Sequence, residues 1–112
     1  QLRLGITDDK QSYGFIDLYD YDFINRRVGV GIIIFKKNRS KGIGLSSLQL
    51  TENYLLEHVP IHQVYANISS TNKESISLFE KSNFVNVGLK KDWIFYNNKF
   101  NDELLFQKIL NK

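Results

Sequence analysis

The chain has 112 residues, a formal net charge of +3 and a hydrophobic fraction of 42%, which is typical of one small globular domain. It contains no cysteine and only two histidines, so a disulfide scaffold, a thiolate metal site, a cysteine nucleophile and a histidine-rich metal centre are excluded. The positive charge is too small for the dense basic stripe of a nucleic-acid-binding domain. No apolar run approaches the ~20 residues of a membrane span and no signal peptide is visible, so we expect a cytoplasmic protein without a metal or membrane partner.

The first third of the chain predicts three strands. Leu2 to Thr7 forms a short strand, and Ser12 to Tyr19 alternates between two faces in the manner of a second. Asp20 to Arg27 is polar and predicts a loop. Val28 to Phe35 is a nearly continuous β-branched run, which is typical of a strand buried on both faces. Because the chain has no methionine and begins inside a predicted strand, we expect residues 1–112 to be one domain that lacks an N-terminal portion.

Two helices follow, with a strand between them. Gly42 to His58 carries leucines at helical spacing, and Pro60 ends this helix. Ile61 to Ser69 predicts a strand. The tetrapeptide Thr71-Asn72-Lys73-Glu74 is a capping-box pattern, and it opens a short helix that runs to about Ser82.

The last third of the chain predicts a strand in two pieces, a turn and a final strand. The pieces are Phe84 to Leu89 and Asp92 to Tyr96, the turn is Asn97-Asn98-Lys99, and the final strand is Glu103 to Leu110. The order is therefore β-β-β-α-β-α-β-β. The strands on either side of the first helix should pair in parallel through a right-handed crossover, and the early and late strands should pair as hairpins. The fold class is α+β with a mixed sheet.

The segment between the third predicted strand and the first helix has the chemistry of an anion site. It is Arg39-Ser40-Lys41-Gly42-Ile43-Gly44. First-turn amides of a helix have no internal partner and can bind a phosphate, and glycine allows a ligand to approach the backbone closely. The basic side chains of Arg39 and Lys41 add positive charge. The spacing fits neither a P-loop nor a dinucleotide fingerprint.

Two segments resemble signatures of the GNAT superfamily of acyl-CoA-dependent N-acetyltransferases. Arg39-x-x-Gly42-x-Gly44 matches its pyrophosphate loop, Gln/Arg-x-x-Gly-x-Gly/Ala. Asn72-x-x-x-Ile76-x-Leu78-Phe79-Glu80-Lys81-x-Asn83-Phe84-x-x-Val87-Gly88 is similar to its second signature, Asn-x-x-x-Ile-x-Leu-Tyr-x-Lys-x-Gly-Phe-x-x-x-Gly. One helix and one strand separate the two segments, as in the family. The resemblance implies a GNAT fold of the α/β three-layer type, with a mostly antiparallel mixed sheet, a splayed parallel strand pair and flanking helices, but without the N-terminal strand and helices.

Segments before and after these signatures resemble one branch of the family. Ile16-Asp17-Leu18-Tyr19-Asp20, Asn25-Arg26-Arg27 and Val30-Gly31-Ile32-Ile33 look like the branch that holds ribosomal-protein N-terminal acetyltransferases and spermidine N-acetyltransferases. The segment Trp93 to Asp102 resembles the late hairpin of that branch. We favour its polyamine-acetylating side.

The resemblance implies an acetyl-CoA site along the third strand and its loop. The pantetheine arm would pair with the strand backbone, the loop amides would hold the pyrophosphate, and Asn72 would hydrogen-bond the pantetheine or phosphate region, although Asn72 could equally be a capping residue. Asn83 replaces the usual glycine of the second signature, and asparagine tolerates the left-handed backbone of such a turn. The residues assigned to acetyl-CoA are Ile33, Ile34, Phe35, Arg39, Ser40, Lys41, Gly42, Ile43, Gly44, Asn72, Phe79 and Lys81.

The implied reaction is attack of a neutral amine on the thioester carbonyl, followed by protonation of the leaving thiolate. Many family members use a tyrosine as that acid, but the aligned residue here is Phe79, which has no proton to donate and is better explained as core filler. The hydroxyl groups of Ser75, Ser77 and Tyr96 are alternative donors. A cationic acceptor could bind the acidic set Asp17, Asp20 and Asp22, which could equally be a solvated acidic loop.

Three functions follow as hypotheses. The first is an acetyl-CoA-dependent N-acetyltransferase that acts on a primary amine, either a polyamine such as spermidine or a peptide N-terminus. The second is a non-catalytic acyl-CoA-binding or regulatory module of the same fold, which Phe79 favours. The third is a small basic nucleic-acid-binding domain, against which the confinement of the basic charge to one turn argues. We expect a homo-oligomer that binds no nucleic acid.

Overall fold

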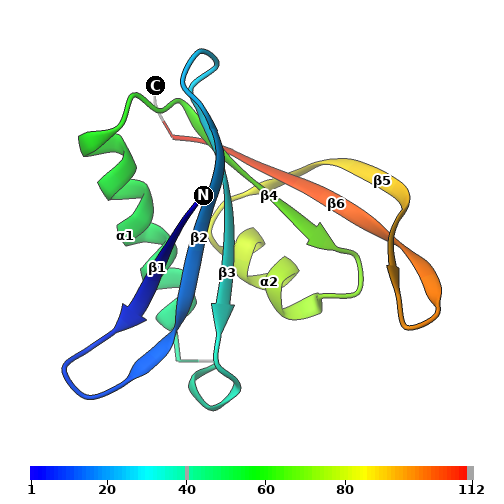
Figure 1. Ribbon diagram of the computed structural model, residues 1–112, viewed down its shortest axis with the longest axis horizontal. Coiled ribbons are helices and arrows are strands. Elements are labelled where there is room, and N and C mark those ends of the chain that lie inside the picture. Colours follow the sequence, from blue (N-terminus) through cyan, green and yellow to red (C-terminus); the bar gives the residue numbers. More distant parts are fainter. Residues whose placement is uncertain (40, 111–112) are drawn as a thin grey trace.

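Six strands form a single mixed sheet in the computed structural model, which describes residues 1–39 and 41–110 (Figure 1). The strand order is β1-β2-β3-β4-β6-β5, and within the described residues only β3 and β4 run parallel. The predicted element order and the α+β class are confirmed. The elements are β1 Leu2–Thr7, β2 Ser12–Asp22, β3 Arg27–Ile34, the 3₁₀ turn η1 Lys36–Asn38, α1 Ile43–His58, β4 Gln63–Ser69, α2 Lys73–Lys81, β5 Val85–Tyr96 and β6 Lys99–Ile109.

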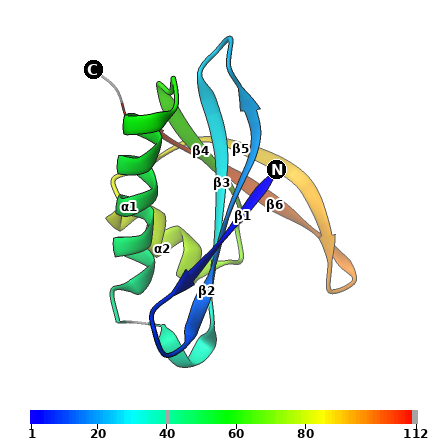
Figure 2. The ribbon, with the colours of Figure 1, turned by 60° about the vertical axis from the view of Figure 1, so that its left-hand side comes forward.

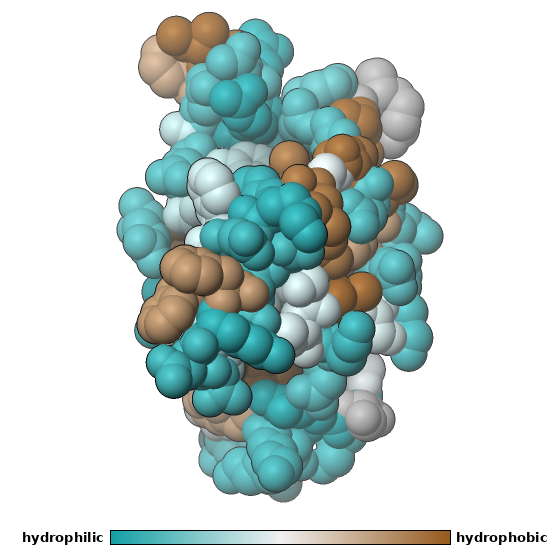
Figure 3. Space-filling model, turned by 90° about the vertical axis from the view of Figure 1, so that its right-hand side faces the viewer, coloured by the Kyte–Doolittle hydropathy of each residue, from teal (hydrophilic) through white to brown (hydrophobic). Residues whose placement is uncertain are grey.

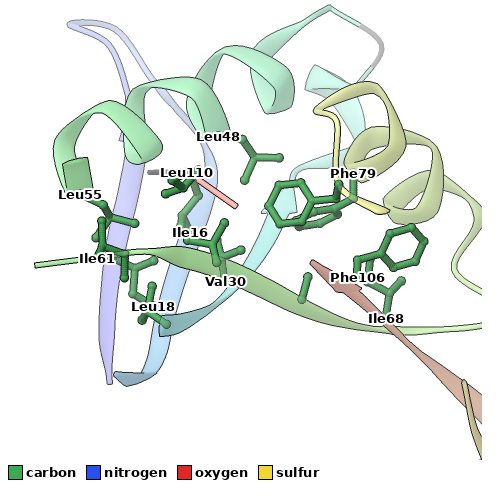
Figure 4. Packing of buried hydrophobic residues seen from close by; sticks show 14 residues of the cluster. Ile16, Leu18, Val30, Leu48, Leu55, Ile61, Ile68, Phe79, Phe106 and Leu110 are labelled. Carbon is green, nitrogen blue, oxygen red and sulfur yellow. The ribbon is translucent and has the colours of Figure 1, made fainter. Parts of the chain in front are cut away.

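Both helices cover the same face of the sheet (Figure 2). Leu48 of α1 and Phe79 of α2 belong to one buried cluster that includes Val30 of β3, Ile68 of β4 and Phe106 of β6 (Figure 4). The alternation predicted for β2 is confirmed over residues 13–19, where Gly14, Ile16 and Leu18 are buried and the odd-numbered residues are half-buried. No helix in the described range is long and apolar enough to cross a membrane.

The parallel strands separate after only three paired positions. The β3–β4 ladder joins Arg27–Gly29 to Gln63–Tyr65 and then ends. The prediction that β3 is buried on both faces is therefore wrong beyond Val30, and Ile33 near its end is 48% exposed. The apolar run was correctly assigned to a strand, but its second half has no strand beside it on the β4 side. This separation opens a groove at the carboxyl end of β3.

Several predicted boundaries differ from the structure. β4 begins at Gln63 and not at Ile61. β2 continues to Asp22 through the segment that was predicted as a loop, because an irregular register after Tyr19 and a positive φ of 52° at Asp20 let polar residues extend the ladder. β5 is one strand, with its register shift between Lys90 and Ile94 where two pieces were predicted. β6 begins at Lys99, the last residue of the predicted turn, and not at Glu103, because the β5–β6 hairpin is already paired at Tyr96 and Lys99.

Candidate functional site

The loop between β3 and α1 presents the start of α1 to the groove. Gly42 is the N-cap of α1 and has a φ of 78°, a left-handed backbone that glycine adopts without strain. Its carbonyl accepts the first bond of the helix, from the N–H of Ser46 at 3.0 Å. No acidic side chain lies in the first turn, so the unpaired amides there retain their preference for an anion. Ser40, which was assigned to the same site, lies outside the described residues.

A groove of about 600 Å³ extends from this loop along the free edge of β3 to α2. The serines Ser75 and Ser77, proposed as proton donors, also line it. Three described residues that were assigned to acetyl-CoA, Phe35, Lys41 and Phe79, are not part of this lining. Of the residues assigned to acetyl-CoA, those that do line the groove are Ile33, Ile34, Arg39, Gly42, Ile43, Gly44, Asn72 and Lys81. The two sequence signatures therefore meet at one groove, although Asn72 lies 28 positions after Gly44 in the chain.

The Arg39 side chain lies across the groove. Its Nε donates to the carbonyl oxygen of Ile34 at 3.0 Å, and its Nη1 donates to Oε1 of Glu74 at 2.7 Å. The predicted positive charge is thus present at the groove, but a carboxylate from α2 already pairs with it.

The cap of α2 differs from the predicted capping box. The N-cap is Asn72, whose Oδ1 accepts from the N–H of Ser75 at 3.1 Å, and Asn72 therefore has the capping role that was one of its two explanations. The prediction of a Thr71–Glu74 capping box is wrong, because Glu74 pairs with Arg39 and does not return to its own helix.

Asn38 is a groove residue that the sequence analysis did not identify. It ends η1, is only 3% exposed and lines the groove. Within the described residues its Oδ1 is buried without a hydrogen-bond partner. A buried amide oxygen at a binding groove is suited to a donor group on a ligand, because leaving it unpaired is costly. No local pattern could have identified it, since its burial depends on how β3 and α1 meet.

Phe79 and Tyr96 lie away from the groove lining for different reasons. Phe79 is 2% exposed, and its ring packs nearly perpendicular to that of Phe84 at 4.8 Å, which confirms its role as core filler. Tyr96 is 66% exposed and lies at the end of β5, which is separated from β4 by β6. The structure therefore brings Ser75 and Ser77, but not Tyr96, to the groove.

The three acidic residues predicted to bind an acceptor all lie on β2, but their surroundings differ. Asp17 accepts from Nε and Nη2 of Arg3 at 2.7 and 2.9 Å, which lowers the pKa of its carboxyl group. Asp22 accepts from the backbone and side chain of Asn25 in the β2–β3 turn, and these bonds lower its pKa. Asp20 is exposed. All three are thus on one strand, but Asp17 and Asp22 are already engaged in local contacts.

Comparison with known proteins agrees with this geometry. Residues 2–85 match the family model described as acetyltransferase (GNAT) domain, and the chain therefore belongs to the GNAT acetyltransferase family. Spermidine N(1)-acetyltransferase of Vibrio cholerae is 24% identical over 116 residues, covering 98% of this chain and 67% of that protein. A putative ribosomal N-acetyltransferase of Bacillus subtilis is 24% identical over 111 residues, covering 99% of this chain and 60% of that protein. Both belong to the branch that the sequence segments resembled.

The fold is also that of solved structures. The crystal structure of spermidine N-acetyltransferase from Vibrio cholerae in complex with CoA and spermine matches with a TM-score of 0.85 at 21% identity, over 92% of this chain and 61% of that one. The predicted GNAT fold is thereby confirmed. The chain spans 60% to 67% of the length of the two relatives named above.

Proposed function

We propose that this chain binds acetyl-CoA in the groove and transfers the acetyl group to a primary amine. The observation that carries the proposal is the convergence of three elements on one space: the free edge of β3, the glycine-capped start of α1 and the groove-facing side of α2. Membership of an acetyltransferase family supports the reaction class.

The residues that line the groove fit the chemistry of this donor. Unpaired amides at the start of α1 suit the diphosphate, because they present N–H groups and the positive end of the helix dipole. Among the described residues the space beside Gly42 is open, since an added Cβ would meet none of their atoms within 4 Å apart from its chain neighbours. The edge of β3 offers backbone groups to the two amides of the pantetheine arm. The Oδ1 of Asn38, which has no hydrogen-bond partner among the described residues, can accept from an N–H or O–H group of the pantetheine arm.

The transfer step needs a proton for the leaving thiolate. Ser75 and Ser77 are the hydroxyl-bearing residues of α2 in the described lining of the groove, so we propose that one of them, or a water held there, donates it. Phe79 takes no part, because it lies in the core and has no exchangeable proton.

For the acceptor we propose a polyamine such as spermidine. The named activity of the Vibrio cholerae relative supports this choice, and Asp17, Asp20 and Asp22 supply carboxylates along β2 for a cationic chain. A peptide N-terminus is the second acceptor class, supported by the Bacillus subtilis relative. Offering spermidine and a peptide amine to the protein in parallel transfer reactions separates the two classes.

Calorimetric titration with acetyl-CoA, followed by an assay of acetyl transfer, tests the proposal. We expect binding of the order of 1 μM to 1 mM. Changing both Arg39 and Lys41 to alanine removes two positive charges from the loop, and we expect it to weaken binding by about tenfold or more. Changing Lys91 and Lys99 on the β5–β6 hairpin removes the same charge away from the groove, and we expect it to leave the affinity unchanged. Equal weakening by both double variants would mean that general charge attraction, and not this loop, holds the ligand.

A non-catalytic acyl-CoA-binding module is the second candidate function. It is favoured by one observation, the burial of a phenyl ring at the position where family members carry the acidic tyrosine. Acetyl-CoA binding without transfer to any amine offered would support this function over the enzyme.

We also propose that the chain self-associates through the outer edge of β5. This edge strand exposes Val85, Val87 and Leu89 by 51% to 61%, and an unpaired apolar edge is suited to pairing with another chain. Apolar side chains interrupt the polar surface on the side that carries the β5–β6 hairpin (Figure 3). Light scattering should give a mass above 13.1 kDa, and Val87→Lys should lower it. A monomer mass for the unaltered chain would contradict the proposal.

A further inference from the structure

The ion pair between Arg39 and Glu74 connects the two sides of the groove. Arg39 follows β3 and η1, and Glu74 lies in the first turn of α2, 35 positions further along the chain. Within the described lining of the groove, Glu74 is the single acidic residue, beside the cations Arg39, Lys73 and Lys81. The groove that we propose binds the negatively charged acetyl-CoA therefore contains the carboxylate of Glu74. This carboxylate neutralises the positive charge of Arg39, the first residue of the loop signature.

The second contact of Arg39 covers a backbone group of the same groove. The N–H of Phe35 donates to the carbonyl of Tyr13 in β2 at 2.8 Å. Because successive residues of a strand direct their backbone groups to opposite edges, the carbonyl of Ile34 faces away from β2 and toward the groove. That carbonyl accepts from Nε of Arg39. One side chain thus joins an acceptor on β3 to the carboxylate of Glu74.

We propose that Glu74 is a positioning residue that holds Arg39 across the groove and thereby sets how tightly the groove binds a diphosphate. The inference rests on the proposed function. When an acyl-CoA enters, the guanidinium exchanges Glu74 for phosphate oxygens, and the carbonyl of Ile34 becomes free for an N–H of the pantetheine arm. The exchange is inexpensive, because the side chains of Arg39 and Glu74 are 41% and 68% exposed and an exposed ion pair contributes little.

Glu74→Gln tests the inference, because it keeps the size of the side chain and removes its charge. We expect this variant to bind CoA about twofold to fivefold more tightly than the unaltered chain at low salt, the range that an exposed ion pair allows. The difference should shrink at about 1 M salt, where charges a few ångströms apart are screened. Glu80→Gln on the same helix is the matched control, since Glu80 is exposed and does not line the groove, and we expect it to leave CoA binding unchanged.

A double-mutant cycle separates this role from simple repulsion between Glu74 and phosphate. If Glu74 acts through Arg39, the gain from Glu74→Gln should be lost in an Arg39→Ala background. A gain that persists unchanged in that background, or a Glu74→Gln variant that binds CoA no more tightly than the unaltered chain, would overturn the inference and leave the proposed function standing. Failure of the unaltered chain to bind CoA at all would overturn both.

Discussion

Replacing Phe79 with alanine should lower the free energy of unfolding by about 3–5 kcal/mol. The side chain is 2% exposed and lies where α2, the sheet and Phe84 meet, so its removal leaves a cavity that several rigid elements surround (Figure 4). Denaturant titration followed by circular dichroism measures the change, which should appear as a lower midpoint with an unchanged slope.

Phe95→Ala is the control for this substitution. Phe95 is 62% exposed on β5, so removing the same ring there should cost about 1 kcal/mol or less. If the two variants lose equal stability, α2 does not dock on the sheet as described. A large loss of stability at Phe79 and a small one at Phe95 would agree with the role of Phe79 in packing.

Gly42→Val should produce the largest loss of acyl-CoA binding, more than about tenfold, together with a loss of stability of about 1–3 kcal/mol. The φ of 78° at Gly42 is strained for a β-branched residue, although the space around it is open. Relief of that strain would rotate the amides at the start of α1 away from the groove. Calorimetry with CoA and a denaturant titration measure the two effects separately.

Gly42→Asn distinguishes backbone conformation from the presence of a side chain. Asparagine adopts the left-handed region more readily than valine, so this variant should retain more of both the stability and the affinity. If Gly42→Asn and Gly42→Val lose CoA binding to the same extent, a side chain in the path of the ligand is the cause, and the argument from backbone conformation fails.

The sequence predicted those features of the site that depend on the backbone preferences of neighbouring residues. The β-branched run, the glycine turn and the leucine spacing placed β3 and α1 within a residue or two of their observed bounds. The left-handed backbone expected at Asn83 is present, with a φ of 70°. These features depend on the steric and hydrogen-bonding preferences of residues close together in the chain, and such preferences are visible in a sequence.

Features that depend on distant contacts were not predictable in the same way. Glu74 matched a capping box, but its carboxylate pairs with a residue on another element. Ile33 matched a buried strand, but Ile34 beside it faces α1, so Ile33 lies on the opposite face of the sheet, which neither α1 nor α2 covers. The burial of Asn38 depends on the packing of a turn against the groove. In each case the contact or the burial of the side chain depends on elements that are distant in the sequence, and a single sequence does not show which elements will lie beside it.

The short ladder between β3 and β4 divides the sheet into two units, β1-β2-β3 and β4-β6-β5. Backbone bonds along Arg27–Gly29 join them at one end, and at the other end the groove separates them. A molecule held by both β3 and α2 would act as a removable cross-link between the units. The free energy of binding would then add to the free energy that local opening of the sheet requires. The concentration of acyl donor would therefore determine how rarely the two units separate, as well as what fraction of the groove is filled.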